Sequence, residues 1–122
     1  MTYQQIYLDG KRSLQEAGID SPAFDALCSQ CFSMDRQGLA VHGAEEAPAG
    51  QEACYQAWIR RRGEGEPLQY ILGEWEFMGL PFSVGEGVLI PREDTEVVVR
   101  ECARRLSGFS KPIVLDLCAG SG

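Results

Sequence analysis

The last eleven residues, PIVLDLCAGSG (112–122), constrain the fold of this chain more than any other segment. Residues 113–117 form an apolar run interrupted by one acid, which is typical of a strand buried on both faces of a parallel sheet. A single parallel strand cannot pair its own backbone N–H and C=O groups. We therefore expect an α/β unit to begin here, and we interpret the chain as the N-terminal piece of a longer protein.

A glycine-rich loop follows the predicted strand. The strand would bring Asp116 to its carboxyl end, the place where α/β folds bind nucleotides. Gly120 and Gly122 lack a Cβ, so the backbone can approach a ligand closely. The dinucleotide fingerprint has three glycines, and Cys118 stands at the position of the first. This spacing alone leaves open a NAD site, a methyl-donor site or a glycine-rich turn without a ligand.

Helical patterns fill the chain up to about residue 72. A helix over 3–17 should end at Gly18, and a second over DSPAFDALCSQCFSMD should begin at Ser21 and Pro22. Asp35 can cap a third helix that runs to Val41, and further helices are expected over 51–62 and within EPLQYILG (66–73). The apolar positions expected to face inward are Phe24, Leu27, Cys28, Cys31 and Phe32 in the second helix and Cys54, Ala57 and Trp58 in the fourth.

The pattern changes after residue 73. Aromatic and β-branched residues over 74–90, broken by Gly79-Leu80-Pro81 and Gly85-Glu86-Gly87, predict a β-hairpin. Residues 93–107 are helical again, and their inward positions should be Val97, Val98, Cys102 and Leu106. The expected fold is mainly α: a helical bundle domain (1–73), a β-hairpin linker (74–92), and the first helix and strand of a truncated Rossmann-like α/β domain (93–122).

Composition restricts the class of protein. The net charge of −7 disfavours a broad nucleic-acid-binding surface, and the basic run 60–62 resembles the solvated end of a helix. No stretch approaches the ~20 apolar residues of a membrane span, and the N-terminus lacks the apolar region of a signal peptide. Five cysteines, an odd number, fit a reducing compartment. We expect a cytoplasmic protein.

The two cysteines of the motif CSQC (28–31) are the strongest candidates for metal or redox chemistry in this sequence, but the signal is weak. The motif lies inside a predicted helix on its apolar face, whereas thioredoxin-like chemistry needs the pair at a helix start. Zinc would need two further ligands, and the chain has one histidine, His42, in a predicted loop. We expect Cys28 and Cys31 to be reduced core residues, His42 to be exposed without a partner, and no metal site.

Four motifs resemble the HemK/PrmC family of release-factor glutamine methyltransferases. They are G-E-P-x-x-Y-x-x-G at 65–73, E-F-x-G-x-x-F-x-V at 76–84, L-I-P-R-x-x-T-E at 89–96 and D-L-x-x-G-x-G at 116–122. The segment AGIDSPAFDAL (17–27) is also similar to the family's entry to its second helix. The resemblance covers essentially the whole chain, and the second and third motifs are highly specific.

The resemblance implies a function and a site. The family transfers a methyl group from S-adenosylmethionine to the glutamine side-chain amide of peptide-chain release factors. The residues that would bind the donor are Asp116, Cys118, Ala119, Gly120, Ser121 and Gly122. The residues of the linker near the pocket are Pro91, Arg92, Thr95 and Glu96. The family's N-P-P-Y tetrad and its ribose-binding acid are absent from these residues, so the chain alone should be inactive.

Two other functions remain open at this level. The chain could be a protein-binding module without chemistry, or part of a nucleic-acid adenine methyltransferase, a class that also uses N-P-P-Y-like tetrads. Acidic charge and the hairpin argue against the adenine class. The C-terminal strand also needs partners, so we expect either self-association through an exposed edge or docking on the 93–107 helix.

Overall fold

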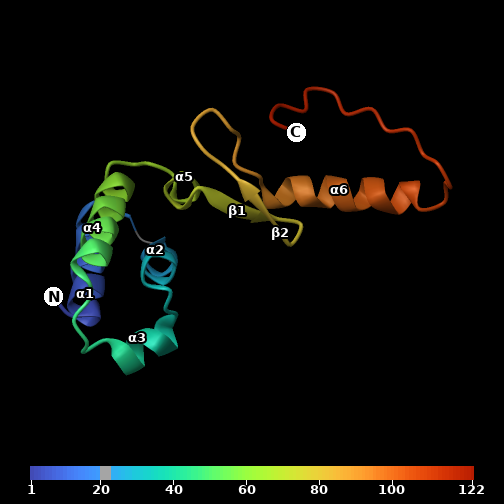
Figure 1. The fold of residues 1–122 in the computed structure, drawn as a ribbon. Coiled ribbons are helices and arrows are strands. Elements are labelled where there is room, and N and C mark those ends of the chain that lie inside the picture. Colours follow the sequence, from blue (N-terminus) through green and yellow to red (C-terminus); the bar gives the residue numbers. More distant parts are fainter. Residues whose placement is uncertain (20–22) are drawn as a thin grey trace. The chain divides into compact units, whose positions relative to one another are not determined.

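The structure is a computed structural model that describes residues 1–19 and 23–122. It divides into two units, Met1–Leu72 and Gly73–Gly122. The first unit contains α1 (Tyr3–Glu16), α2 (Ala23–Phe32), α3 (Arg36–His42), α4 (Ala49–Gly63) and α5 (Leu68–Leu72). The second contains β1 (Glu74–Phe77), β2 (Leu80–Ser83) and α6 (Glu93–Leu106) (Figure 1).

The ends of α1 follow from local chemistry. The Thr2 side chain accepts a hydrogen bond from the backbone N–H of Gln5, and the Gln5 side chain accepts one from the N–H of Thr2. At the other end Gly18 takes a φ of +74°, which glycine adopts without strain. The predicted helix and its stop are confirmed.

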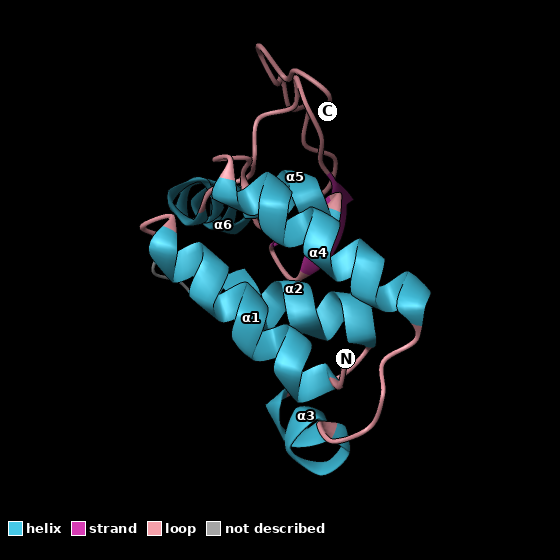
Figure 2. Cartoon of the chain, turned by 90° about the vertical axis from the view of Figure 1, so that its left-hand side faces the viewer, coloured by secondary structure: helices cyan, strands magenta, loops and turns pink. Residues whose placement is uncertain are grey.

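The core of the first unit lies where α1, α2 and α4 pack against one another (Figure 2). The buried hydrophobic residues are Tyr3, Ile6, Leu14, Leu27, Cys28, Phe32, Tyr55, Ile59 and Ile71. The predicted stripe of α2 is confirmed at Leu27, Cys28 and Phe32, and Cys31 packs at its margin. Ser21, Pro22 and the side chain of Phe24 lie outside the described residues. The helices α1, α2, α4 and α5 thus share one continuous apolar core.

The predicted inward face of α4 is wrong by one residue. Cys54 and Ala57 are exposed, whereas Tyr55 and Ile59 are buried and Trp58 is partly buried. Tyr55 and Ile59 are four residues apart and therefore lie on the same side of the helix. Their larger side chains fill the core between the three helices better than the cysteine and alanine would. The helix also begins at Ala49, two residues before the predicted start.

The short helix α3 begins as predicted and ends one residue later. The Asp35 carboxylate caps it by accepting a hydrogen bond of 2.8 Å from the N–H of Gly38. His42 is the last helical residue and not part of a loop, and its Nδ1 lies 2.8 Å from a Glu45 carboxylate oxygen. The predicted exposure of His42 is confirmed, and the prediction that it has no partner is wrong.

The predicted hairpin is confirmed. Trp75 pairs with Phe82 and Phe77 with Leu80 in an antiparallel register. The turn is Met78-Gly79, with φ values of +54° and +75°, so both central residues are left-handed as a tight type I′ hairpin requires. Pro81 lies within β2 opposite Glu76, where a two-stranded sheet tolerates it because each strand is an edge. The turn is therefore one residue earlier than the glycine-proline pattern indicated.

The helix α6 is confirmed, but its predicted inward face and the strand after it are not. Val97, Val98 and Cys102 are exposed, and Leu106 is half-buried. Residues 113–117 form no strand, and Ile113 is 98% exposed. They also do not bury Ile113, Val114 and Leu115 against α6, as docking on that helix would require. A parallel strand needs neighbouring strands, and nothing among the described residues pairs with this segment.

Candidate functional site

A cavity of about 590 Å³ in the second unit brings the predicted site residues together. The hairpin, the linker after it, α6 and the C-terminal loop all contribute to its walls. Every predicted residue of the glycine-rich loop lines it, as do Pro91, Arg92 and Thr95, while Glu96 does not. Its volume is that of a small-molecule site. Two motifs about twenty residues apart in the sequence therefore surround one space.

The glycine-rich loop forms its own turn at this cavity. Its backbone is left-handed at Cys118, Gly120 and Gly122, with φ values of +58°, +63° and +91°. The N–H of Gly122 donates a 3.1 Å hydrogen bond to the carbonyl of Ala119. A Cβ at Gly120 would meet nothing within 4 Å, so glycine is favoured there by backbone conformation and not by crowding. The loop backbone is therefore open toward the cavity.

The linker residues stand at the start of α6. Arg92 precedes the helix in an extended conformation, and its carbonyl accepts from the N–H of Thr95 at 3.2 Å. The Asp94 side chain accepts from the same N–H at 2.9 Å. Thr95 and Val99, one helical turn apart, face the cavity. Arg92 and Asp116 thus contribute one basic and one acidic residue to the walls of the same cavity.

Glu96 has a different place from its neighbours in the motif. One carboxylate oxygen accepts a 2.8 Å hydrogen bond from the N–H of Met78 in the hairpin turn. The other lies 3.2 Å from the Arg100 guanidinium one turn along α6. The side chain is only 20% exposed. The sequence placed Glu96 near the pocket but indicated no role for it. Its partner is a backbone N–H group, and no sequence motif predicts such a contact.

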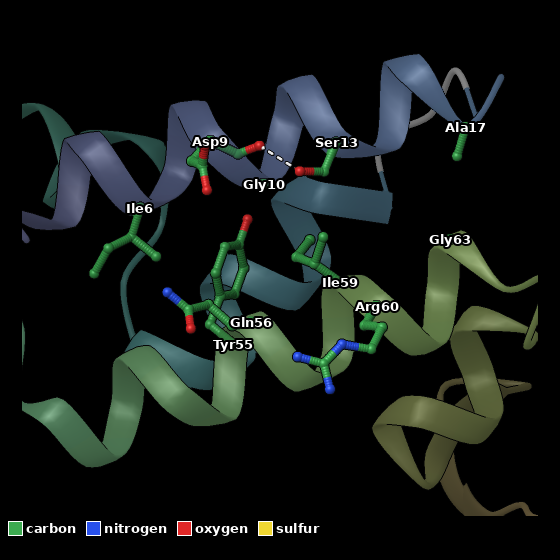
Figure 3. A pocket seen from close by; sticks show the side chains of 10 residues that line it. All are labelled: Ile6, Asp9, Gly10, Ser13, Ala17, Tyr55, Gln56, Ile59, Arg60 and Gly63. Carbon is green, nitrogen blue, oxygen red and sulfur yellow. Dashed lines mark hydrogen bonds between the residues drawn. The ribbon is translucent and has the colours of Figure 1, made fainter.

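A second cavity, of about 500 Å³, lies between α1 and α4 in the first unit (Figure 3). Ile6, Tyr55 and Ile59 line its apolar part, and polar side chains such as Asp9 and Arg60 line its rim. Sequence reasoning missed this cavity. The available signal was Gly10, because a glycine inside a helix costs about 0.5–1 kcal/mol relative to alanine and often marks a close approach.

Gly10 lets α1 approach the ring of Tyr55. A Cβ at Gly10 would lie 2.8 Å from Tyr55 Cε1 and 2.9 Å from its hydroxyl oxygen. The Tyr55 hydroxyl is buried, and no described residue hydrogen-bonds it. Burial raises the pKa of Tyr55 above its ordinary range. Tyr55 is therefore a core residue that closes the floor of the α1–α4 cavity in its neutral form.

The cysteines of CSQC have the environment of core residues. Cys28 is 3% exposed, and burial raises the pKa of its thiol to about 11. Burial, with Cys54 as a further neighbour, raises the pKa of Cys31 to about 12. A thiol must ionise to bind zinc or attack a disulfide, and both of these resist ionisation. Across the described ranges, no three histidine, cysteine or acidic side chains form a cluster that could hold a metal ion.

Two of the three arginines at the end of α4 bind their own chain. Arg61 makes a bidentate pair with the Glu66 carboxylate at 2.7 and 2.6 Å, and Arg62 donates to the Glu66 carbonyl at 3.1 Å. These contacts support the interpretation of the basic run as a helix end. In the part of the chain that the structure describes, no helix combines the length and the apolar character needed to cross a membrane.

Comparison with known proteins gives one family and a consistent set of relatives. The family model described as the PrmC N-terminal domain matches residues 5–73. A release factor glutamine methyltransferase of Bifidobacterium longum is 39% identical over 129 residues, covering 100% of this chain and 44% of the relative. One of Moorella thermoacetica is 41% identical over 125 residues with the same coverages.

A third relative with the same name, from Fusobacterium nucleatum, is 37% identical over 112 residues, which cover 89% of this chain and 32% of the relative. The chain therefore spans less than half the length of these curated relatives.

Proposed function

Because the chain belongs to the PrmC N-terminal domain family of release factor glutamine methyltransferases, we propose that it is the N-terminal part of such an enzyme. The parent protein would transfer a methyl group from S-adenosylmethionine to the glutamine side-chain amide of a peptide-chain release factor. Residues 1–73 would recognise the protein substrate, and residues 93–122 would begin the domain that binds the donor. Residues 74–92 would link these two parts.

The observation that carries this proposal is the cavity in the second unit. Residues of both the L-I-P-R-x-x-T-E and the D-L-x-x-G-x-G motifs line it, together with the hairpin and α6. The open, left-handed backbone at Gly120 fits the close approach of a donor molecule. Asp116 and the loop Cys118–Gly122 would hold the donor, and Pro91, Arg92 and Thr95 would form the opposite wall. When bound, S-adenosylmethionine supplies a methyl group on a positively charged sulfur.

The contribution of these residues to the chemistry is positioning. An amide nitrogen is a poor nucleophile, so its lone pair must be aligned with the methyl group before transfer. The residues of this chain would hold S-adenosylmethionine so that its methyl group points toward the amide nitrogen. The groups that hold the substrate amide belong to motifs that these 122 residues do not contain.

Methyl transfer by the full gene product tests the function. It is incubated with labelled S-adenosylmethionine and either a release factor or adenine-containing nucleic acid, and the labelled residue is mapped. We expect label on a glutamine of the release factor. Label on adenine would favour the nucleic-acid class, and no label on either would contradict the proposal. The chain of residues 1–122 alone should transfer nothing above background.

Donor binding by the full gene product tests the site. Gly120→Ala forces a side chain into a left-handed backbone, so calorimetry should show roughly five- to thirtyfold weaker donor binding. The matched control is Gly108→Ala, at a glycine without a left-handed φ where a Cβ also meets nothing within 4 Å. Equal affinities for both variants would contradict the assignment of the loop.

The helical unit would contact the release factor through the cavity between α1 and α4. Its rim carries Asp9 and Arg60, whose charges are unpaired among the described residues, above an apolar floor. Reversing one charge with Arg60→Glu should raise the KM for the release factor while leaving donor affinity unchanged. Arg12→Glu, at an exposed position of α1 outside the cavity, is the control. Equal KM values for the two variants would contradict this contact.

A further inference from the structure

The contact between α6 and the hairpin turn depends on one side chain. The Glu96 carboxylate accepts the N–H of Met78 at 2.8 Å, and Arg100 holds its second oxygen at 3.2 Å. Met78 is a non-glycine residue with a φ of +54°, a conformation that is uncommon and needs support from its surroundings. A hydrogen bond to an ionised acceptor is among the stronger ones a backbone N–H can make. Glu96 thus supports the hairpin at its strained point.

The hairpin that Glu96 holds is a wall of the cavity. Phe77 and Phe82, whose rings meet edge to face with centroids 6.0 Å apart, line it from the two strands. Thr95 and Val99 line it from α6. The helix therefore presents two adjacent faces, one toward the cavity and one, through Glu96 and Arg100, toward the turn. Because Glu96 contacts the turn and does not itself line the cavity, we expect a substitution there to move the aromatic wall relative to Thr95.

We propose that Glu96 is a positioning residue, which acts through the N–H of Met78 to hold the Phe77–Phe82 wall of the cavity against α6. The neighbouring acids do not share this role. Asp94 accepts the N–H of Thr95 within its own turn, and Glu93 is exposed and has no hydrogen bond among the described residues. A role in stabilising the start of α6 through its dipole would be common to all three acids, whereas the contact with the turn belongs to Glu96 alone.

Amide hydrogen exchange of Met78 tests the contact directly in the 122-residue chain. Glu96→Leu removes the acceptor and should accelerate exchange of this amide at least tenfold. Glu96→Gln keeps an oxygen in the same place and should restore most of the protection. The control Glu93→Leu removes a carboxylate from the same helical turn and should leave Met78 unchanged. Unchanged protection in Glu96→Leu, or equal loss in both leucine variants, would overturn the proposal.

Steady-state kinetics of the full gene product test the consequence, and this arm rests on the proposed function. Glu96→Leu should raise the KM for S-adenosylmethionine at least fivefold with a smaller change in kcat. Glu96→Gln should recover most of the difference, and Glu93→Leu should behave as the wild type. Wild-type kinetics in Glu96→Leu would overturn the positioning role. A wild-type protein without activity would contradict the proposed function, and the Met78 exchange rates would still decide the positioning of the hairpin.

Discussion

The two units of this chain differ in where their stability comes from. Among its described residues, Met1–Leu72 buries nine hydrophobic side chains, Cys28 included, in one core shared by its helices. In Gly73–Gly122 the single buried hydrophobic residue is Val84, and Val97, Ile113 and Leu115 lie largely exposed. Hydrophobic burial is the main term that offsets the conformational entropy of folding. The first unit therefore carries its own stabilisation, while the second is held mainly by the hairpin and the contacts of α6.

The same substitution in the two units gives the largest expected contrast. Leu14→Ala removes a fully buried side chain from the core, so we expect the free energy of unfolding to fall by about 2–5 kcal/mol. Leu115→Ala acts at a residue that is 79% exposed and should change it by less than about 0.5 kcal/mol. Denaturant unfolding followed by circular dichroism measures both. Comparable losses would show that Leu115 is buried in solution and would remove the contrast.

Two glycines within the helical unit sharpen the description of its core. Gly10→Ala places a methyl group 2.8 Å from the ring of Tyr55, which packs against Phe32 in the core, so the ring or α1 must shift and we expect a loss of about 1–3 kcal/mol. Gly50→Ala, in α4, meets nothing within 4 Å and should be neutral or stabilise by up to about 1 kcal/mol. Thermal unfolding of both variants checks the prediction. A stabilising Gly10→Ala would mean that α1 and α4 are not closely packed.

Cys28 gives a smaller effect with a pH signature. Cys28→Ala should cost about 1–2 kcal/mol through lost packing, less than a leucine deletion. The folded state holds the pKa of this thiol at about 11, above the ordinary value of 9.0, so the unfolded chain loses the proton first. Its contribution to stability is complete below pH 9 and is lost as the pH rises toward 11.

Unfolding curves at pH 8, 9 and 10 should therefore show a fall in stability for the wild type. The fall should be smaller in Cys28→Ala, because that variant has no thiol to ionise at this position. Parallel curves for the two proteins would show that the Cys28 thiol ionises as easily in the folded chain as in the unfolded one. Stoichiometric zinc in the purified protein would separately contradict the interpretation of CSQC as core.

Local sequence signals predicted the elements that local interactions determine. The start of α3 at Asp35, the stop at Gly18 and the hairpin each depend on capping or turn chemistry within a few residues. In the glycine-rich loop, Gly120 and Gly122 were named from spacing and the remaining residues from the family resemblance, and all of them line the cavity. Features that depend on distant partners were harder to predict, and two cases show this clearly.

The first case is the inward face of α4. It depends on how closely α1 approaches α4 at Gly10, and the spacing of apolar residues in the sequence does not predict that distance. The second is the run 113–117, which has the composition of a buried strand and forms none, because strand pairing requires neighbours that the described residues do not supply. The role of Glu96 belongs to the same class, since its partner is a backbone N–H eighteen residues away.

Amide hydrogen exchange of the 122-residue chain in dilute solution tests the contrast between the two units most directly. Amides in the interiors of α1, α2 and α4 should exchange slowly, because their opening requires disruption of the shared core. Amides of residues 113–117 should exchange at close to the rate of an unstructured peptide, since they have no strand partner and their side chains are exposed. Protection of 113–117 equal to that of α2 would show that this segment is folded in the chain by itself, and it would contradict the account.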